Sequence, residues 1–590
     1  MKVTFILCLV VILIATLIYF LFFRMKKSLK TNILFGFLVC IIAITILVYP
    51  LLDYDNAYTR AFASFIYATK CIGMSQNLDV LAKISLKSIF GWTYFALINF
   101  FFLALPCLTA GMIMSFIDKI VTYIKLRYYK NKKIFVFSEL NDKSLIVAKN
   151  LERDSLIIFA NVNEKKDIGI KSIKTNKKVT NLELHSKSDI TFYMISNNEA
   201  NNLTDTLELI NKYKNRDKTK IYVVNQKDEA STILDSTDKG KIFLEIINEN
   251  ERHVFSLLNN KPLFINALNK TISILIVGCG DIGKEFLKDA IWCGIIPNYQ
   301  LKFLVVDIDA NKIKDKINIQ MPELLNNYDI SFINGDIEST NVIERIKDSN
   351  DINYILVSME NDDKNINTAI MLRRLFLREF NSNPIINLYI SNEYKREQIS
   401  SLLNEKGDSY NFNAFGDIKD IYGKYHENGS ELERLATKVH LIYDPSDKDL
   451  ARYNLREYNK RSSRATALHL KYKLFTVLGD KYTDDMSKNL DLFREAYSSK
   501  IEDLLVRNEH DRWMAYMRSI GYIYVSTSDV TKYYKKTNNY INYLARMHPA
   551  LVPYDKLDKV SKELEKITSN KINLKENDEV IINSMKNIKL

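Results

Sequence analysis

Three long apolar segments lie within the first 120 residues of the chain. The segments Val3–Phe23, Ile33–Leu52 and Ser88–Ile117 contain no charged residue. Each is long enough to cross a hydrocarbon core of roughly 30 Å as a helix. A cleaved signal peptide would be shorter, would end in a small-residue cleavage pattern and would not be followed by further spans. The pattern therefore predicts a membrane domain, residues 1–125, with three transmembrane helices.

The charged residues beside these segments predict their orientation. Four basic residues lie within residues 24–30, after the first segment, and five lie within residues 125–133, after the third. Basic residues flanking spans favour the cytoplasmic side. We therefore expect the N-terminus outside the cell membrane, residues 53–87 as an external or re-entrant segment, and residues 118–590 in the cytoplasm.

The segment 53–87 raises the question of a pore. A semi-apolar stretch, Ala61–Ala68, is followed by Thr69–Met74 and then by the third span. A half-helix and a Thr/Gly turn between two spans is the arrangement of a potassium-channel pore, in which backbone carbonyls of a glycine-rich filter replace the ion's hydration shell. Here Gly73 is the one glycine and Lys70 would oppose a cation. The pattern favours a re-entrant segment that does not conduct potassium, with a selective pore as the alternative.

Beyond the membrane domain, short apolar runs alternate with helical patterns, which predicts parallel sheets. The clearest unit begins with a buried strand at Ile272–Val277 and continues with the glycine run Gly278–Gly283. A helical stretch, Lys284–Trp292, follows, and the next strand, Leu301–Val306, ends at Asp307. This order of strand, GxGxxG, helix, strand and acid is typical of a Rossmann unit that binds a dinucleotide.

Each residue type in this run has a physical role. Gly278 permits a tight turn, Gly280 lets a pyrophosphate approach the backbone, and Gly283 lets the helix pack on the strand. The helix N-terminus offers free N–H groups to phosphate, and Asp307 can accept a hydrogen bond from a ribose hydroxyl. The alternative is a Rossmann unit that keeps its glycines for packing alone. The predicted sites for NAD(H) or another adenine nucleotide are Gly278, Gly280, Asp281, Ile282, Gly283, Asp307, Asp309 and Asp336.

Further motifs extend this unit over residues 269–440. Gly335-Asp336 follows a strand, and the run Tyr354–Asn365 leads into a helix that ends at Arg373-Arg374. Residues 270–400 thereby resemble the TrkA-N, or RCK, regulatory domains of potassium channels and transporters. The resemblance implies binding of NAD(H), ATP or a related nucleotide and pairing with another copy, hence a homo-oligomer such as a dimer or tetramer. It also implies regulation of a membrane part and not hydride transfer.

A degenerate first copy is predicted at residues 126–268. Its first strand, Lys133–Phe137, leads into Ser138–Lys143, which contains no glycine. The second strand ends in Ala160-Asn161 where an acid would stand, and Glu139 would repel a phosphate. We therefore interpret the two units as an internal duplication in which the first copy is a structural partner of the second.

The C-terminal part, residues 441–590, is predicted to be mainly helical and is rich in Arg and Tyr. The runs Ser463–Ala467, Glu509–Trp513 and His548–Tyr554 resemble those of the ryanodine-receptor-type (RyR) domain that prokaryotes fuse to TrkA-N units, with Ser463 in place of the family's Asn. Arginine forks suit phosphate, and aromatic faces suit a base. The alternative is that these residues hold a small helical domain together. The predicted second ligand site comprises Arg461, Arg464, Glu509, His510, Arg512, Trp513, Tyr522 and His548.

Composition narrows the function classes. The net charge of +12 is explained in part by basic residues next to the membrane, and there is no basic, aromatic-interleaved motif for nucleic acid. Four of the six cysteines lie in the predicted membrane region, and their spacing predicts neither a disulfide framework nor a metal site. We expect no catalytic residues, because no nucleophile or metal set accompanies Glu509 and His510.

These observations lead to three hypotheses. The first is a membrane-anchored sensor or effector, in which a nucleotide bound to the RCK-like or RyR-like domain changes the state of the membrane segment. Fusions of this kind imply stress or phage-defence signalling, through the resemblance alone. The second is a potassium channel or a regulator of potassium transport. The third is an NAD-dependent oxidoreductase. The expected partners are the lipid bilayer, a small nucleotide and further copies of the chain.

Overall fold

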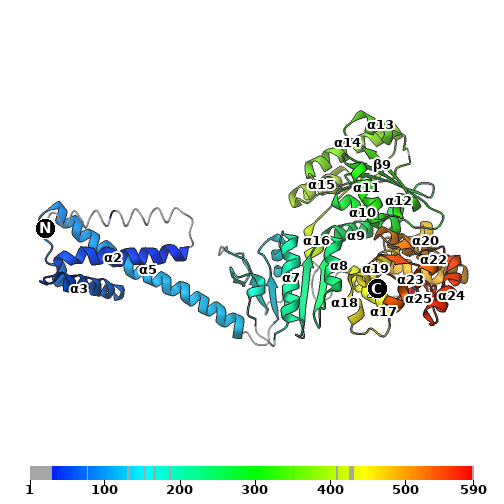
Figure 1. Ribbon diagram of the computed structural model, residues 1–590. Helices are drawn as coiled ribbons and strands as arrows, with labels where there is room; N and C mark the ends of the chain where they lie inside the picture. The colour runs from blue at the N-terminus through cyan, green and yellow to red at the C-terminus, as the bar shows by residue number, and fades with distance from the viewer. Residues whose placement is uncertain are drawn as a thin grey trace. The chain divides into compact units, whose positions relative to one another are not determined.

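The computed structural model describes residues 13, 29–75, 77–128, 133–151, 155–163, 168–184, 188–349, 351–406, 410–423 and 431–587. The chain divides into two compact units (Figure 1). The first comprises residues 1–131 with 183–187, and the second comprises residues 132–182 and 188–590.

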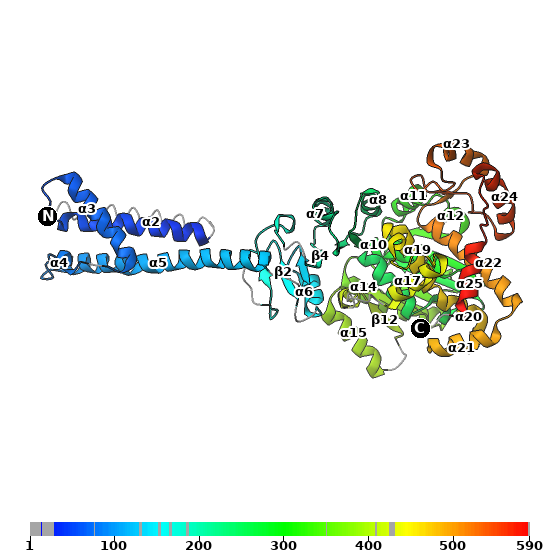
Figure 2. The ribbon, with the colours of Figure 1, turned by 90° about the horizontal axis from the view of Figure 1, so that it is seen from below.

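The first unit is helical. Its apolar core joins Ile44 and Leu47 to Tyr67 and Ala68, and to Ile98. The tyrosine hydroxyl of Tyr94 donates a hydrogen bond to the Leu47 carbonyl. Figure 2 shows the last helix, α5, as one continuous rod. The helices are α2 (Leu29–Val48), η1 (Tyr49–Leu51), α3 (Ala57–Lys70), η2 (Cys71–Gly73), α4 (Leu78–Leu81) and α5 (Ile89–Tyr128).

One helical stretch of the described residues, Ile89–Met114 in α5, is long and apolar enough to cross a membrane, with a mean hydropathy of 2.0. It falls within the third predicted span. The second predicted span coincides with a shorter apolar helix, Gly36–Leu51. The first predicted span lies outside the described residues except for Leu13. Three spans and their orientation therefore stay predictions.

The second unit contains two parallel six-stranded sheets. The first has the order β3-β2-β1-β4-β5-β6, and the second, from the equivalent edge, has the order β9-β8-β7-β10-β11-β12. Both are the strand order of a dinucleotide-binding fold, 3-2-1-4-5-6. This confirms the prediction of two doubly wound parallel sheets. The strands are β1 (Ile134–Phe137), β2 (Leu156–Phe159), β3 (Ile173–Lys174), β4 (Ile190–Met194), β5 (Thr219–Val224), β6 (Phe243–Ile247), β7 (Thr271–Val277), β8 (Gln300–Asp307), β9 (Asp329–Asn334), β10 (Tyr354–Val357), β11 (Ile385–Tyr389) and β12 (Phe412–Phe415).

A ladder of aromatic rings crosses one face of the first sheet. Ring centroids are 5.1 Å apart between Phe159 and Phe137, 5.0 Å between Phe137 and Tyr193, and 5.1 Å between Tyr193 and Tyr222. The rings stack because the parallel register sets these residues on one face of neighbouring strands. Such a face is strongly apolar and must be covered. The helices that accompany the first sheet are α6 (Asp142–Lys149), α7 (Glu199–Tyr213), α8 (Asp228–Ser236) and α9 (Glu249–Asn260).

The helix that follows the last strand of each sheet packs on the other half of the duplication. After β6, α9 lies along α10 of the second half. After β12, α16 (Ile418–Tyr422) lies against α6 and α9, and its Ile421 and Tyr422 join the aromatic core of the first sheet. The Tyr422 hydroxyl donates to Glu249, at the start of α9. The helices of the second half are α10 (Asp281–Cys293), α11 (Ala310–Gln320), α12 (Leu324–Asn327), α13 (Thr340–Lys347), α14 (Asp362–Phe380), α15 (Glu393–Lys406) and α16.

The C-terminal region is mainly helical, as predicted, and it shares a core with the second sheet. That core contains Trp292 of α10 and Tyr354 of β10 together with Tyr472 and Met517 from the C-terminal helices. Helix α22 lies along α10 and along α25. The elements are α17 (Glu431–Tyr443), α18 (Ala451–Leu455), α19 (Glu457–Leu468), α20 (Leu470–Leu478), α21 (Met486–Ala496), α22 (Ser499–Ser519), β13 (Ile523–Tyr524), α23 (Thr527–Thr537), β14 (Met547–His548), α24 (Leu557–Thr568) and α25 (Glu576–Met585).

Candidate functional site

The glycine run between β7 and α10 has a different steric constraint at each glycine. Gly278 adopts φ +83°, and a Cβ there would lie 2.8 Å from the Met359 backbone nitrogen. A Cβ on Gly283 would lie 2.2 Å from the Gly278 carbonyl oxygen. A Cβ on Gly280 would meet no described atom within 4 Å. Gly278 and Gly283 are therefore required by the fold, whereas Gly280 borders open space.

Helix α10 begins at this open position. Gly280 is its N-cap, and the Gly280 carbonyl accepts the Lys284 amide at 2.9 Å. The amides of the first turn have no intrahelical acceptor, so they are available to an anion. Asp281 is exposed in this turn and Ile282 is buried. The turn thus offers backbone donors, with one carboxylate beside them.

The acid after β8 lies against the glycine run. One Asp307 carboxylate oxygen accepts the Cys279 amide at 2.7 Å, and the other accepts the Asp309 amide at 2.9 Å. Burial and the charge of Asp307 raise the pKa of the Cys279 thiol to about 12. Between the two acids, Ile308 exposes 69% of its surface. Asp336, after β9, is also exposed, and it accepts the Glu338 amide at 3.0 Å.

The loop after β10 closes the other side of the glycine run. The Ser358 hydroxyl donates to the Gly278 carbonyl at 2.8 Å. Asn365 accepts the Met359 amide at 2.8 Å and donates to the Met359 and Tyr389 carbonyls at 3.0 and 2.8 Å. Sequence reasoning did not assign a role to Ser358 or Asn365, which hold this loop in place.

The first copy repeats this asparagine clamp. Asn202 accepts the Ser196 amide at 2.9 Å and donates to the Ser196 and Val224 carbonyls at 2.9 and 3.2 Å. In both copies the asparagine stands six residues after the residue that it clamps. That shared interval is a sequence signal that could have identified both residues.

In the first copy, side chains accept hydrogen bonds from amides at the start of α6. Asn141 caps α6 by accepting the Ser144 amide at 2.9 Å, and it donates to the Ile195 carbonyl at 2.7 Å. Glu139 accepts the Asn197 amide at 3.2 Å. Two amides at the start of α6, those of Asn141 and Ser144, are therefore engaged here by side chains of the protein itself.

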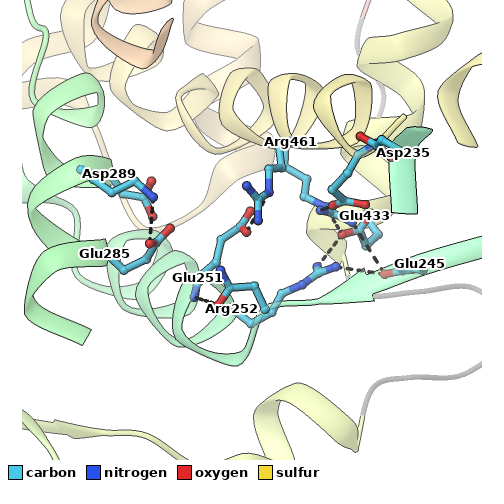
Figure 3. A network of polar contacts seen from close by, with 12 residues as sticks. Asp235, Glu245, Glu251, Arg252, Glu285, Asp289, Glu433 and Arg461 are labelled. Carbon is cyan, nitrogen blue, oxygen red and sulfur yellow. Dashed lines mark hydrogen bonds and ion pairs between the residues drawn. The ribbon is translucent and has the colours of Figure 1, made fainter. Parts of the chain in front are cut away.

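The arginines of the predicted second ligand site form buried ion pairs. Arg461 points toward Glu251, at 3.3 Å, in Figure 3. Arg464, whose side chain is 2% exposed, pairs with Glu433 and, at 2.7 Å, with Glu457. Arg252 of α9, which also pairs with Glu433, and Arg464 keep the pKa of Glu433 low, at about 2, despite its burial. This network joins the first sheet and α9 to α17 and α19.

A second buried cluster lies on α22. Glu509 pairs with Lys473 at 2.6 Å and with Arg512 at 2.8 Å, and the three side chains are each 1% exposed. On the next face of α22, the Trp513 ring lies 5.5 Å from that of His510 and 4.9 Å from that of His548. His510 also contacts Asp578, at 3.1 Å, and the Val552 carbonyl, at 2.8 Å.

The structure thus brings together two of the predicted groups: His510 with Trp513 and His548, and Glu509 with Arg512. Tyr522 is buried elsewhere, 6.2 Å from the ring of Tyr458. The guanidinium groups of Arg464 and Arg512 already face carboxylates inside the protein.

Two further features were not predicted. A cavity of about 420 Å³ between α9, α15 and β12 is lined by polar residues that include Arg396 and Asp417, which pair at 2.8 Å, and by none of the predicted site residues. His440, Asp444 and Asp447 have possible metal-ligand atoms within 4.8 Å of one another. These groups already have protein partners: Asp447 accepts from His440 at 2.8 Å, and Asp444 pairs with Arg452.

Comparisons with known proteins assign no family. No protein-family model matches the chain, and no curated protein matches it. Among solved structures, the chain is similar to the GsuK L97D mutant, with 14% identity over 70% of this chain and 98% of the other, at a TM-score of 0.33. GsuK bound to NAD matches with 12% identity over 68% and 84%, at a TM-score of 0.35. The GsuK channel matches with 15% identity over 66% and 95%, at a TM-score of 0.34.

Proposed function

We propose that this chain is a membrane-anchored regulator whose second sheet binds NAD(H) or another adenine nucleotide. The observation that carries the proposal is the open space at Gly280, between two glycines that the fold requires. A glycine kept for packing would contact something, whereas this one leaves room for a pyrophosphate at the N-terminus of α10. Asp281 and Ile282 supply backbone amides in the same turn.

The neighbouring groups fit the rest of a nucleotide. Asp307 keeps lone pairs for ribose hydroxyls beyond the two amides that it accepts, and Asp309 and Asp336 flank the same edge of the sheet. Exposed Ile308 offers an apolar surface for a base. The acidic surroundings disfavour an additional phosphate on the ribose, so NAD(H) is the better fit than its 2′-phosphorylated form.

Ligand binding would be transmitted through α10. Its first turn forms the cradle, while the rest of the helix is buried against α9 and α22. A change at its N-terminus therefore acts on elements of both the first half and the C-terminal region. The state of the membrane segment is the proposed output.

The test is nucleotide-dependent thermal stabilisation of the full chain in detergent, with NADH, NAD and ATP. A nucleotide at 100 times its Kd stabilises the folded state by about 2.7 kcal/mol. Gly280→Asp should abolish this shift, because its carboxylate would occupy the phosphate position, and Gly280→Ala should weaken it without lowering basal stability. Full retention of the shift in Gly280→Asp would place the ligand elsewhere and refute the proposal.

Gly283→Ala is the matched control. Its Cβ would clash with the Gly278 carbonyl, so this substitution should lower the melting temperature without any nucleotide present. Together, Gly280→Asp and Gly283→Ala distinguish a loss of nucleotide binding from a loss of folding stability. Turnover of NADH by the wild-type chain would instead support the oxidoreductase alternative.

A second candidate is a potassium channel or a regulator of potassium transport. It is favoured by the order of a long helix, a half-helix and a long helix (α2, α3, α5) ahead of the two sheets. The turn after the half-helix is not an extended filter: the Cys71 carbonyl accepts the Met74 amide at 3.1 Å, and the Lys70 carbonyl accepts the Ser75 amide at 3.4 Å. Regulation of another ion pathway therefore fits better than conduction through this turn. Potassium flux into vesicles, with and without NADH, tests it.

A further inference from the structure

Helix α3 exposes an apolar stripe. Tyr58, Phe62, Phe65 and Ile66 are exposed by 88%, 66%, 47% and 37%, and their spacing places them on one face of the helix. The opposite face is buried and includes Tyr67. A short helix that exposes four large apolar side chains is not expected to face water.

The stripe from Tyr58 to Ile66 carries no charge, and the exposed Lys70 ends the helix one turn beyond Ile66. Between Ala57 and Thr69 the one charged residue is Arg60. Its guanidinium donates to the Tyr54 carbonyl and lies 5.7 Å from the Tyr49 ring, so it is directed back toward the start of the helix. The two charged residues of α3, Arg60 and Lys70, therefore lie outside the stripe.

Helix α3 packs beside the apolar helices α2 and α5. Tyr67, Ala68 and Cys71 belong to one apolar core with Leu47 of α2 and Ile98 of α5. Ile98 is nine residues into the Ile89–Met114 stretch, which corresponds to about 13 Å along the helix. The C-terminal half of α3 thus packs against apolar parts of both longer helices.

We propose that α3 is lodged in one leaflet of the bilayer, with its Phe62–Ile66 face against lipid acyl chains. The inference rests on the membrane anchoring in the proposed function. Lipid is favoured over a second copy because the neighbouring helices also expose large apolar side chains: Leu38 and Ile42 of α2 by 48% and 51%, and Phe100 of α5 by 65%. A hydrocarbon solvent would cover all of these surfaces together.

The test uses the full chain with the photo-crosslinker p-benzoylphenylalanine in place of Phe62, in vesicles of phosphatidylcholine and phosphatidylglycerol. After irradiation, mass spectrometry of the tryptic peptide 61–70 should show a phospholipid adduct. The same crosslinker in place of Asn77, an exposed residue of the polar turn before α4, should give none. Replacing Phe65 provides a second position if the first variant does not insert.

The outcomes separate this inference from the proposed function. A dimer-sized band from position 62 would show that a second copy covers the stripe and would overturn the inference. A lack of any lipid adduct at both positions 62 and 65 in inserted protein would also overturn it. Extraction of the wild-type chain from membranes by alkaline carbonate would instead refute the anchoring itself.

Discussion

The buried ion cluster on α22 gives the sharpest stability prediction. Glu509 contacts the Lys473 ammonium at 2.6 Å and the Arg512 guanidinium at 2.8 Å, with all three side chains 1% exposed. Glu509→Gln preserves the shape of the side chain but removes its charge. Two buried cations would then face a neutral amide.

The loss in free energy of unfolding caused by Glu509→Gln can be estimated in two ways. Breaking a buried ion pair by neutralising one partner costs about 3–5 kcal/mol. The cations hold the pKa of Glu509 at about 2, against an ordinary value of 4.5, despite its burial. At about 1.4 kcal/mol for each pH unit, this difference corresponds to about 3 kcal/mol. Because the folded-state pKa is lowered, this contribution is fully present above pH 4.5 and is lost as the pH falls toward 2.

Thermal unfolding of the full chain, followed by tryptophan fluorescence at neutral pH, measures the effect. For a cooperative region of 150–250 residues, the loss should lower the melting temperature by about 6–20 °C. Asp503→Asn on the same helix is the matched control, because its pair with Arg507 is exposed and is worth less than about 1 kcal/mol. Equal melting temperatures for the two variants would refute the reasoning.

Three further predictions concern buried groups. Tyr516→Phe should leave the melting temperature unchanged or raise it, because the Tyr516 hydroxyl is buried without a hydrogen-bond partner among the described residues. A loss of more than about 2 kcal/mol in the free energy of unfolding would contradict this. Burial lowers the pKa of His548 to about 3, so the folded state binds one proton fewer than the unfolded state between pH 3 and 6.5. Stability should therefore fall on acidification below pH 6.5 by about 1.4 kcal/mol per unit, and His548→Gln should flatten the slope measured by denaturant titration. Cys279, with its raised pKa and 2% exposure, should resist maleimide labelling at pH 7 in the folded chain, and mass spectrometry of the digested protein reports this.

The glycine run could be predicted from the sequence because glycine spacing encodes local backbone geometry. The φ of +83° at Gly278 and the close helix–strand contact at Gly283 each require a missing Cβ, and these two requirements, with the open position at Gly280 between them, fall within six residues. The sheets were also predictable, since continuous apolar runs of strand length are typical of parallel strands covered on both faces.

The partners of the C-terminal arginines could not be predicted in the same way. A guanidinium that binds phosphate and one that neutralises buried carboxylates are the same residue type in sequence. Arg464 meets Glu433 and Glu457 from nearby helices and Glu245 from β6 of the first sheet, more than 200 residues earlier. Only the tertiary fold brings such partners together. The sequence pattern therefore identified these residues but not the groups that they contact.

The exchanged helices make the two sheets depend on each other. Helix α9 leaves the first sheet to cover α10, the helix that begins after Gly280, while α16 leaves the second sheet to cover the aromatic ladder of the first. Removing either half would expose a large apolar face on the other, at a cost of roughly 25 cal/mol for each Å² uncovered. Each half therefore depends on the other for the packing of its core. A substitution in α16 that weakens its packing on the first sheet should therefore destabilise the second sheet as well, even though α16 lies far from the glycine run in sequence.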